Sequence, residues 1–135
     1  MKDVEKNKFF EKAREKASSV LNNNDRLKQL FANSTEKLSA VNLENFKGSK
    51  FVDRIRVLIR MVKAYKRGEY RNIKLQNILL IVAALVYFVT PLDLIPDFIP
   101  ITGLVDDFTV IVWVYNKVQQ EIDKFMEWEN GLEIE

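Results

Sequence analysis

Four carboxylates are the side chains of this sequence with the most chemical potential. Asp93, Asp97, Asp106 and Asp107 lie within a segment built mainly from Leu, Ile, Phe, Pro and Val. Because a carboxylate in apolar surroundings is costly unless it is paired, hydrogen-bonded or hydrated, each of these groups needs a partner or water. The acidic segment is therefore the first candidate for a functional site.

Two interpretations of this segment involve no other part of the chain. In the structural interpretation, Asp93 and Asp97 cap turns between prolines, while Asp106 and Asp107 begin a helix, whose dipole favours carboxylates. In the other, Asp97 and the adjacent pair Asp106 and Asp107 supply oxygen ligands to Mg²⁺ or Ca²⁺. The spacing matches no recognised metal-binding loop, and adjacent aspartates on a helix point in different directions. The identity of any bound metal stays unknown.

The composition excludes most familiar enzyme mechanisms. The chain has no cysteine and no histidine, which removes disulfides, thiolate zinc sites, Ser-His and Cys-His nucleophiles and the usual proton shuttle near neutral pH. Catalysis would need a metal at the acidic segment to activate water, and the sequence holds no signature of a substrate pocket. We therefore expect a protein that is not an enzyme, with no catalytic residue, no cofactor, no identifiable small-molecule substrate and no nucleic-acid partner.

A proline-rich elbow holds the aspartates. Thr90 can cap a short helical turn that starts at Pro91, and Asp93 can return a hydrogen bond to the cap. Beyond this turn a regular helix is interrupted, and a sharp bend is allowed, by Pro96, Pro100 and Gly103. Apolar stretches flank the elbow at 73–89 and 105–116. The sequence thus predicts a hydrophobic helical hairpin over residues 73–116, folded around the elbow.

The hairpin carries a specific sequence motif. The segment from Tyr87 to Asp107 reads YFVTPLDLIPDFIPITGLVDD and resembles the YkvA-like family, a bacterial domain of unknown function. The matching positions are an aromatic residue, a Ser or Thr before Pro, Asp-Leu-Ile-Pro-Asp, Phe-Ile-Pro, Gly and a closing Asp-Asp. The resemblance covers about residues 74–117 and implies a membrane-associated helical hairpin. It implies no activity, substrate or catalytic residue.

Further helices are predicted on both sides of the hairpin, giving an all-α fold of about five helices. Residues 1–48 form an N-terminal region with two amphipathic helices, which pack on or beside the hairpin. The first runs over 4–21, and the second is capped by Asn24 or Asp25 and runs to Val41. Residues 49–135 form the YkvA-like region: a helix over 49–67 that Ser49 caps and Gly68 ends, the hairpin, and an acidic helix over 117–130 that continues the second helix of the hairpin without a break. The first twenty residues contain no continuous apolar stretch, so we expect no cleaved signal peptide.

Apolar residues at helical spacing predict the face that each of these helices buries. For the first helix the positions are Phe10, Ala13, Ala17, Val20 and Leu21; for the second, Leu27, Leu30, Phe31, Ser34, Leu38 and Val41; for the third, Phe51, Ile55, Leu58, Ile59, Val62 and Tyr65; and for the last, Val118, Ile122, Phe125 and Met126.

Charge is unevenly distributed along the chain. From Lys47 to Lys74 ten basic residues outnumber two acidic ones, and from Leu75 onward ten acidic residues outnumber two basic ones. A basic stripe at three-to-four spacing runs beside the apolar face of the third helix, at Arg56, Arg60, Lys63 and Arg67. This stripe is a candidate for contact with an anionic membrane surface, although many charged helix faces are only solvated. Alternatively, the elbow aspartates pair with Arg54, Arg60 or Arg71.

The hairpin has two plausible environments. No charged residue occurs from Leu75 to Leu92, and a helix of that length spans about 27 Å, the short end of what a bilayer core requires. In one interpretation the hairpin enters the bacterial cytoplasmic membrane with both termini in the cytoplasm. The basic residues that precede the hairpin favour this orientation, because basic segments tend to stay on the cytoplasmic side. A homo-oligomer would then shelter the irregular elbow from lipid. In the other, it is the buried core of a soluble cytoplasmic bundle, which suits a mean hydropathy of −0.15.

We favour the first environment. The expected function is that of a non-enzymatic membrane scaffold or interaction module whose main partner is membrane lipid. The alternative is a soluble helical bundle with a carboxylate cation site at the elbow.

Overall fold

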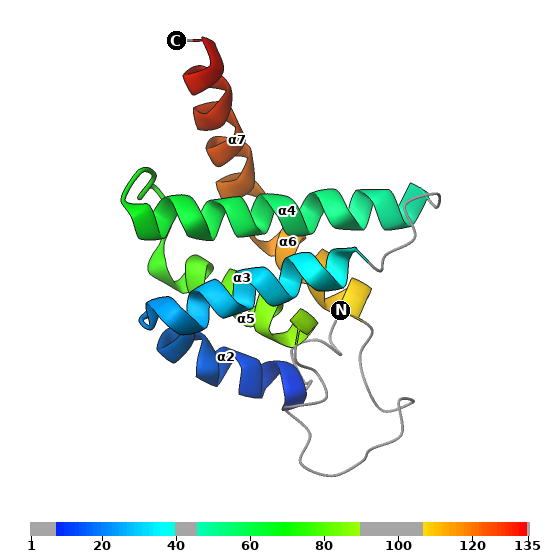
Figure 1. Cartoon of the computed structure of the whole chain (residues 1–135). Helices are drawn as coiled ribbons and strands as arrows, with labels where there is room; N and C mark the ends of the chain where they lie inside the picture. Colours follow the sequence, from blue (N-terminus) through cyan, green and yellow to red (C-terminus); the bar gives the residue numbers. More distant parts are fainter. Residues whose placement is uncertain (1–7, 40–45, 90–106, 135) are drawn as a thin grey trace.

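The computed structural model describes residues 8–39, 46–89 and 107–134, with side chains described for 10–39, 50–89 and 110–131. Within these ranges the chain is all-α, as expected, and contains six helices and no strand, one helix more than the five or so expected. The helices are α2 (Lys8–Leu21), α3 (Asn24–Leu38), α4 (Phe46–Arg67), α5 (Leu75–Val89), α6 (Asp107–Lys117) and α7 (Gln119–Ile134) (Figure 1).

The elbow falls almost wholly outside the described residues. This applies to Thr90, Pro91, Asp93, Pro96, Asp97, Pro100, Gly103 and Asp106. Asp107 is the first residue of α6, but its side chain is also outside the described set. The capping, pairing and cation interpretations of these residues therefore remain predictions.

Helix α5 forms the centre of the molecule. The described part of the uncharged run, residues 75–89, forms a helix of 15 residues, and its buried positions are Ile78, Leu80, Ile81, Val82, Ala83, Ala84, Leu85, Val86, Tyr87 and Phe88. Helices α2, α3, α4 and α6 all pack against it (Figure 1). The hydrophobic helix is thus covered by protein, which is the arrangement described by the bundle interpretation.

Aromatic contacts fix the helices around α5. Phe10 of α2 lies edge-on to Tyr87 of α5, with ring centroids 6.2 Å apart, and edge-on to Trp113 of α6, at 6.0 Å. Phe51 of α4 contacts Phe88 of α5 at 5.6 Å. Since aromatic side chains bury large areas and prefer such tilted geometries, these contacts orient α2, α4 and α6 on a common core.

The faces predicted for the N-terminal helices are confirmed. All five apolar positions of α2 are buried, and in α3 Leu27, Leu30, Ser34 and Leu38 are buried while Phe31 is half-buried. The predicted cap was wrong: the N-cap of α3 is Asn23, whose side-chain oxygen accepts a hydrogen bond from the Arg26 amide at 3.1 Å. The helix ends at Leu38, and Val41 lies outside the described residues.

The predicted start of α4 was also wrong, whereas its end was right. The helix begins at Phe46, so Ser49 lies inside it and is not its N-cap. Gly68 adopts a φ of 77°, and the Gly68 and Glu69 amides donate to the carbonyls of Tyr65 and Ala64 at 3.1 and 3.0 Å. These are the bonds of a Schellman motif, in which a left-handed glycine closes the helix.

The C-terminal segment divides into two helices at Val118, where a single helix was expected. Backbone hydrogen bonds continue through the junction, from the Val118 amide to Val114 and from the Ile122 amide to Val118, both at 3.0 Å. In Figure 1, α7 projects beyond α4, away from α2 and α3. Val118, Ile122 and Phe125 are buried as predicted, but Met126 is 40% exposed, because only one narrow face of α7 meets the other helices.

None of the described helices has both the length and the hydropathy needed to cross a membrane.

Candidate functional site: a basic groove between α3 and α4

The basic stripe predicted on α4 lies on its outer side. Arg56, Arg60 and Arg67 are exposed and Lys63 is half-buried. The opposite face of the helix carries the residues that pack inward, including Ile55, which is fully buried. The stripe is therefore available to a partner in solution or at a surface.

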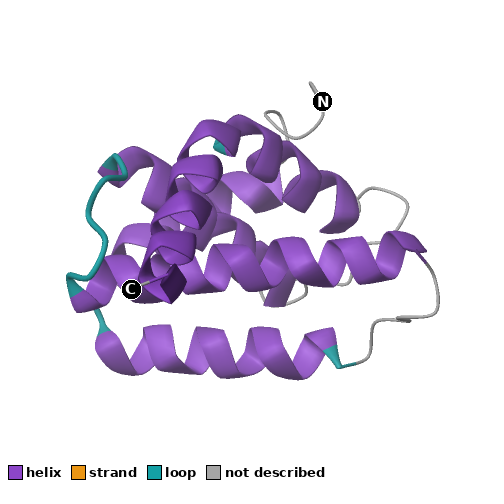
Figure 2. Ribbon diagram, turned by 90° about the horizontal axis from the view of Figure 1, so that it is seen from above, coloured by secondary structure: helices purple, strands orange, loops and turns teal. Residues whose placement is uncertain are grey.

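Two pockets lie between α3 and α4, which run side by side in opposite directions (Figures 1 and 2). The Lys66 pocket, about 490 Å³, is lined by Asn24, Leu27, Lys28, Phe31, Lys63, Lys66 and Arg67. The Arg56 pocket, about 420 Å³, is lined by Thr35, Leu38, Ser39, Val52, Arg56, Ile59, Arg60 and Lys63. Since Lys63 lines both, we treat them as one basic groove.

The groove combines an apolar floor with cationic walls. Its floor includes Leu27, Leu38, Val52 and Ile59, all buried. Its cations are the four stripe residues together with Lys28 and Lys66, and none of the described residues that line it is acidic. Such a lining suits an anionic ligand that also has an apolar part.

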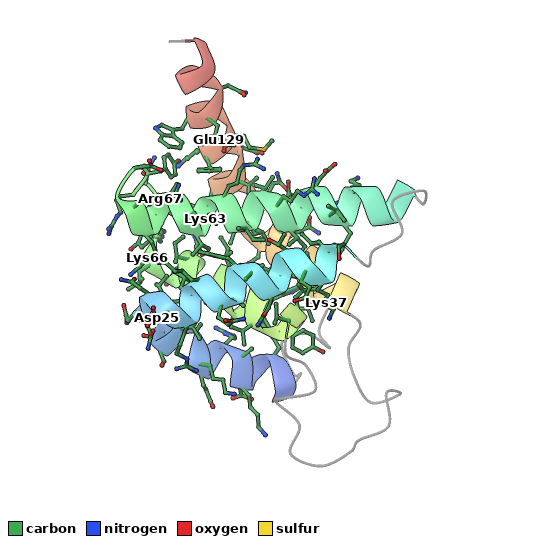
Figure 3. The ribbon with its side chains drawn as sticks, in the orientation of Figure 1. Asp25, Lys37, Lys63, Lys66, Arg67 and Glu129 are labelled. Carbon is green, nitrogen blue, oxygen red and sulfur yellow. The ribbon has the colours of Figure 1, made fainter. Side chains whose placement is uncertain are left out.

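Two of the groove cations have partners within the protein. The Lys63 ammonium lies 5.3 Å from the centroid of the Phe31 ring, a cation–π contact across the groove. The Arg60 guanidinium binds Glu129 of α7 in a bidentate manner, at 2.9 and 3.2 Å. Figure 3 shows Lys63, Lys66 and Arg67 on the C-terminal half of α4 and Glu129 on α7.

A second cleft lies on the other side of the stripe, between α4 and α7. It measures about 630 Å³ and shares Arg60, Lys63 and Arg67 with the groove. Two carboxylates, Glu69 and Glu129, also line it and offset the charge of these cations. The excess of positive charge is therefore concentrated on the α3 side of the stripe.

An aromatic cluster attaches α7 to the rest of the molecule beside this cleft. The centroid of the Tyr70 ring lies 5.4 Å from that of Phe125 and 5.1 Å from that of Trp128. Burial in this cluster, and the nearby carboxylate of Glu121, raise the pKa of Tyr70 above its usual value. The position of Glu129 above Arg60 thus depends on apolar packing as well as on the ion pair.

The predicted pairing of basic residues with the elbow is not tested, because the aspartates are outside the described residues. Arg54 lies 5.2 Å from the Tyr115 ring centroid and Arg71 lies 4.6 Å from that of Tyr65. In the described part of the chain no three acidic side chains come together in a way that could hold a metal ion.

The sequence interpretation missed Lys28, Lys66 and the whole contribution of α3 to the groove. The sequence feature that could have pointed to α3 is the spacing of Asn24, Leu27, Lys28 and Phe31. This spacing places Lys28 beside the apolar face of the helix. That spacing becomes informative only when the facing helix is known.

Comparison with known proteins places the core of the fold in a family. The profile of a family described as "Protein of unknown function (DUF1232)" matches residues 77–113, from α5 through the elbow into α6. A protein of Bacillus subtilis (strain 168) named "Uncharacterized membrane protein YkvA" is 30% identical over 79 residues, which cover 58% of this chain and 74% of the relative. The chain belongs to the YkvA-like family. No solved structure matches it.

The family profile and the groove concern different parts of this YkvA-like protein. The profile covers the central helix, whereas the groove is made by α3 and α4, which precede the matched residues. The profile therefore assigns no role to the groove, whose role must be inferred from the groove's own chemistry.

Proposed function

We propose that this YkvA-like protein is a non-enzymatic, membrane-associated interaction module that contacts anionic lipid headgroups through the basic groove. The observation that carries the proposal is the row of cations at Arg56, Arg60, Lys63 and Arg67, of which Lys63 is half-buried and the other three are exposed. This row lies beside a groove without a described acidic residue. Anionic lipids attract such residues with about 1 kcal/mol for each Lys or Arg near the surface.

Two further observations support contact at the membrane surface. The relative from Bacillus subtilis is named as a membrane protein. In this chain the most apolar helix, α5, is enclosed by α2, α3, α4 and α6. Among the residues whose side chains the structure describes, those that stay exposed are mostly polar or charged. The contact we propose is therefore electrostatic and lies in the headgroup layer.

Vesicle binding tests this function. The purified protein is sedimented with phosphatidylcholine vesicles that contain or lack phosphatidylglycerol. We expect binding only with the anionic lipid, and weaker binding as the salt concentration rises, because exposed charges are screened. Protein that stays in the supernatant with both vesicle types would reject the proposal and leave the interpretation as a bundle without lipid contact.

A pair of variants with equal charge locates the contact. Replacing Arg56 and Arg67 by Gln should weaken binding about thirtyfold, since two lost contacts of about 1 kcal/mol each correspond to that factor. The control replaces Arg14 and Lys16, both exposed on α2, by Gln. Equal losses in the two variants would show that net charge, and not the groove, determines binding.

A further inference from the structure

We propose that the Lys66 pocket is a selective site for the phosphomonoester headgroup of a membrane lipid, as in phosphatidic acid. The inference rests on the proposed function and specifies its ligand. The site lies where the start of α3 faces the end of α4 (Figure 3).

The first reason is the concentration of positive charge. Four of the residues that line the pocket, Lys28, Lys63, Lys66 and Arg67, are cationic, and no acidic one is found among its described lining residues. Like charges gathered around about 490 Å³ repel one another. A bound anion would remove that repulsion and would meet donors from two helices at once.

The second reason is the start of α3. Asn24, the first residue of the helix, lines the pocket. The amides of a first helical turn carry a partial positive charge and lack partners within the helix, so they favour an anion. Here the Arg26 amide already donates to the Asn23 side chain at 3.1 Å, and the other amides of the turn supply the attraction. Asp25, in the same turn, is exposed and does not line the pocket. The helix start therefore adds to the attraction of the four cations.

The third reason is the match in charge and polarity. A phosphomonoester carries a charge of about −1.5 to −2 at neutral pH, and so gains more from this cluster than a phosphodiester, which carries about −1. Leu27 is buried and Phe31 is half-buried at the floor of the pocket. They offer an apolar surface to the glycerol and acyl portion of a lipid, which a free phosphate lacks.

Three other pockets among the described residues suit this ligand less well. The Arg56 pocket has three cations, of which Arg60 is bound to Glu129. The cleft between α4 and α7 includes two carboxylates. A smaller pocket of about 230 Å³ near α2 has an arginine, Arg26, that already donates to the Ser19 hydroxyl at 2.7 Å.

The test compares two anionic lipids at equal surface charge. Vesicles containing phosphatidic acid and vesicles containing phosphatidylglycerol are adjusted to the same zeta potential, and the affinity of the full chain for each is measured by sedimentation. We expect at least about fivefold tighter binding to phosphatidic acid, since its phosphate meets several cations at once.

Matched variants assign the preference to the pocket. Lys66→Gln should reduce the ratio of the affinities for phosphatidic acid and phosphatidylglycerol. The double variant, Lys28→Gln with Lys66→Gln, should bring this ratio to about one. Arg56→Gln, at the other end of the groove, should weaken binding to both lipids by a similar factor and keep the preference. Thermal unfolding of each variant checks that the fold is intact.

Each other outcome overturns a defined part of the inference. Equal binding to the two lipids would refute the selective site and leave the membrane contact in place. Binding to neither would remove the proposed function as well. A further outcome is that glycerol 3-phosphate displaces the protein from vesicles at concentrations near the Kd for the lipid. In that case the ligand would be a soluble phosphate and the lipid assignment would be wrong.

Discussion

At the scale of single residues, Arg60 pairs with Glu129, and the proposed function gives it a lipid phosphate as a competing partner. In the folded chain Glu129 accepts both of its hydrogen bonds, and the two side chains are 45% and 27% exposed. At a membrane, a lipid phosphate would compete with Glu129 for the same guanidinium. Since an exposed ion pair contributes only about 0–1 kcal/mol to folding, this competition costs the protein little.

Replacing Glu129 by Gln should separate these two roles. We expect the free energy of unfolding to fall by less than about 1 kcal/mol. We also expect the affinity for anionic vesicles to rise about fivefold, because Arg60 becomes available to lipid. Urea unfolding and vesicle sedimentation measure the two effects.

Glu127 provides the control for this variant. It is exposed on the same helix, and Glu127→Gln removes the same charge without touching the ion pair. An increase in affinity equal to that of Glu129→Gln would mean that only net charge matters and that Arg60 is not a lipid contact.

The sequence could predict the cations of α4 but not their neighbours. Arg56, Arg60, Lys63 and Arg67 share a face because of their spacing within one helix. The bond between Arg60 and Glu129 depends on the direction of α7 after Val118, and no local signal predicted a division there. Lys28 was overlooked for the same reason, since its role depends on which helix faces α3.

At the scale of helices, Gly68 determines where α4 ends and so holds Lys66 and Arg67 in its last turn. A Cβ at Gly68 would meet nothing within 4 Å, but the φ of 77° is unfavourable for other residues. Gly68→Ala should therefore reduce the free energy of unfolding by about 1 kcal/mol through backbone strain alone.

Gly131 is the matched control for this prediction. It lies within α7, is exposed, and also has open space where a Cβ would stand. Gly131→Ala should stabilise the protein by about 0.5–1 kcal/mol, because alanine is the better helix former. Urea unfolding of both variants should give opposite signs, and a shared sign would contradict the assignment of the left-handed cap.

Helix ends were predicted unevenly, for a physical reason. The prediction that Gly68 ends α4 was right, because a left-handed C-terminal cap strongly favours glycine. The start of α3 offers Asn22, Asn23 and Asn24 in succession, any of which can cap, so the choice depends on how the chain leaves α2. Helix α4 begins before Ser49 and includes Gly48, although glycine has a low helix propensity, so the local sequence favoured a later start.

At the scale of the whole molecule, stability depends on the burial of α5. Leu85 is fully buried, while Leu75 in the same helix is 54% exposed. Leu85→Ala should lower the free energy of unfolding by about 2–5 kcal/mol. Leu75→Ala should change it by less than about 0.5 kcal/mol. Urea unfolding without lipid measures both.

The comparison also tests whether protein or lipid covers α5. A small effect of Leu85→Ala in aqueous buffer, similar to that of Leu75→Ala, would show that this helix is not packed against its neighbours in the absence of a membrane.

The sequence predicted the helices of this fold better than their arrangement. The apolar faces of α2, α3 and α4 followed from spacing, and they imply a common core. Whether an apolar run of this kind is covered by helices or by lipid cannot be read from the run itself, since both surroundings select the same side chains. The contacts of Phe10 with Tyr87 and Trp113 are long-range and carry no local signal.

The central position of α5 has a consequence for the order in which the protein folds during synthesis. Translation completes α2, α3 and α4 before the first residue of α5 exists. Until then Phe10 and Phe51 lack Tyr87 and Phe88, the rings of α5 that they contact. Short amphipathic helices are also marginal in water on their own. A nascent chain that stops before Leu75 should therefore lack a stable tertiary structure. The apolar surface that it exposes would need a chaperone until α5 leaves the ribosome.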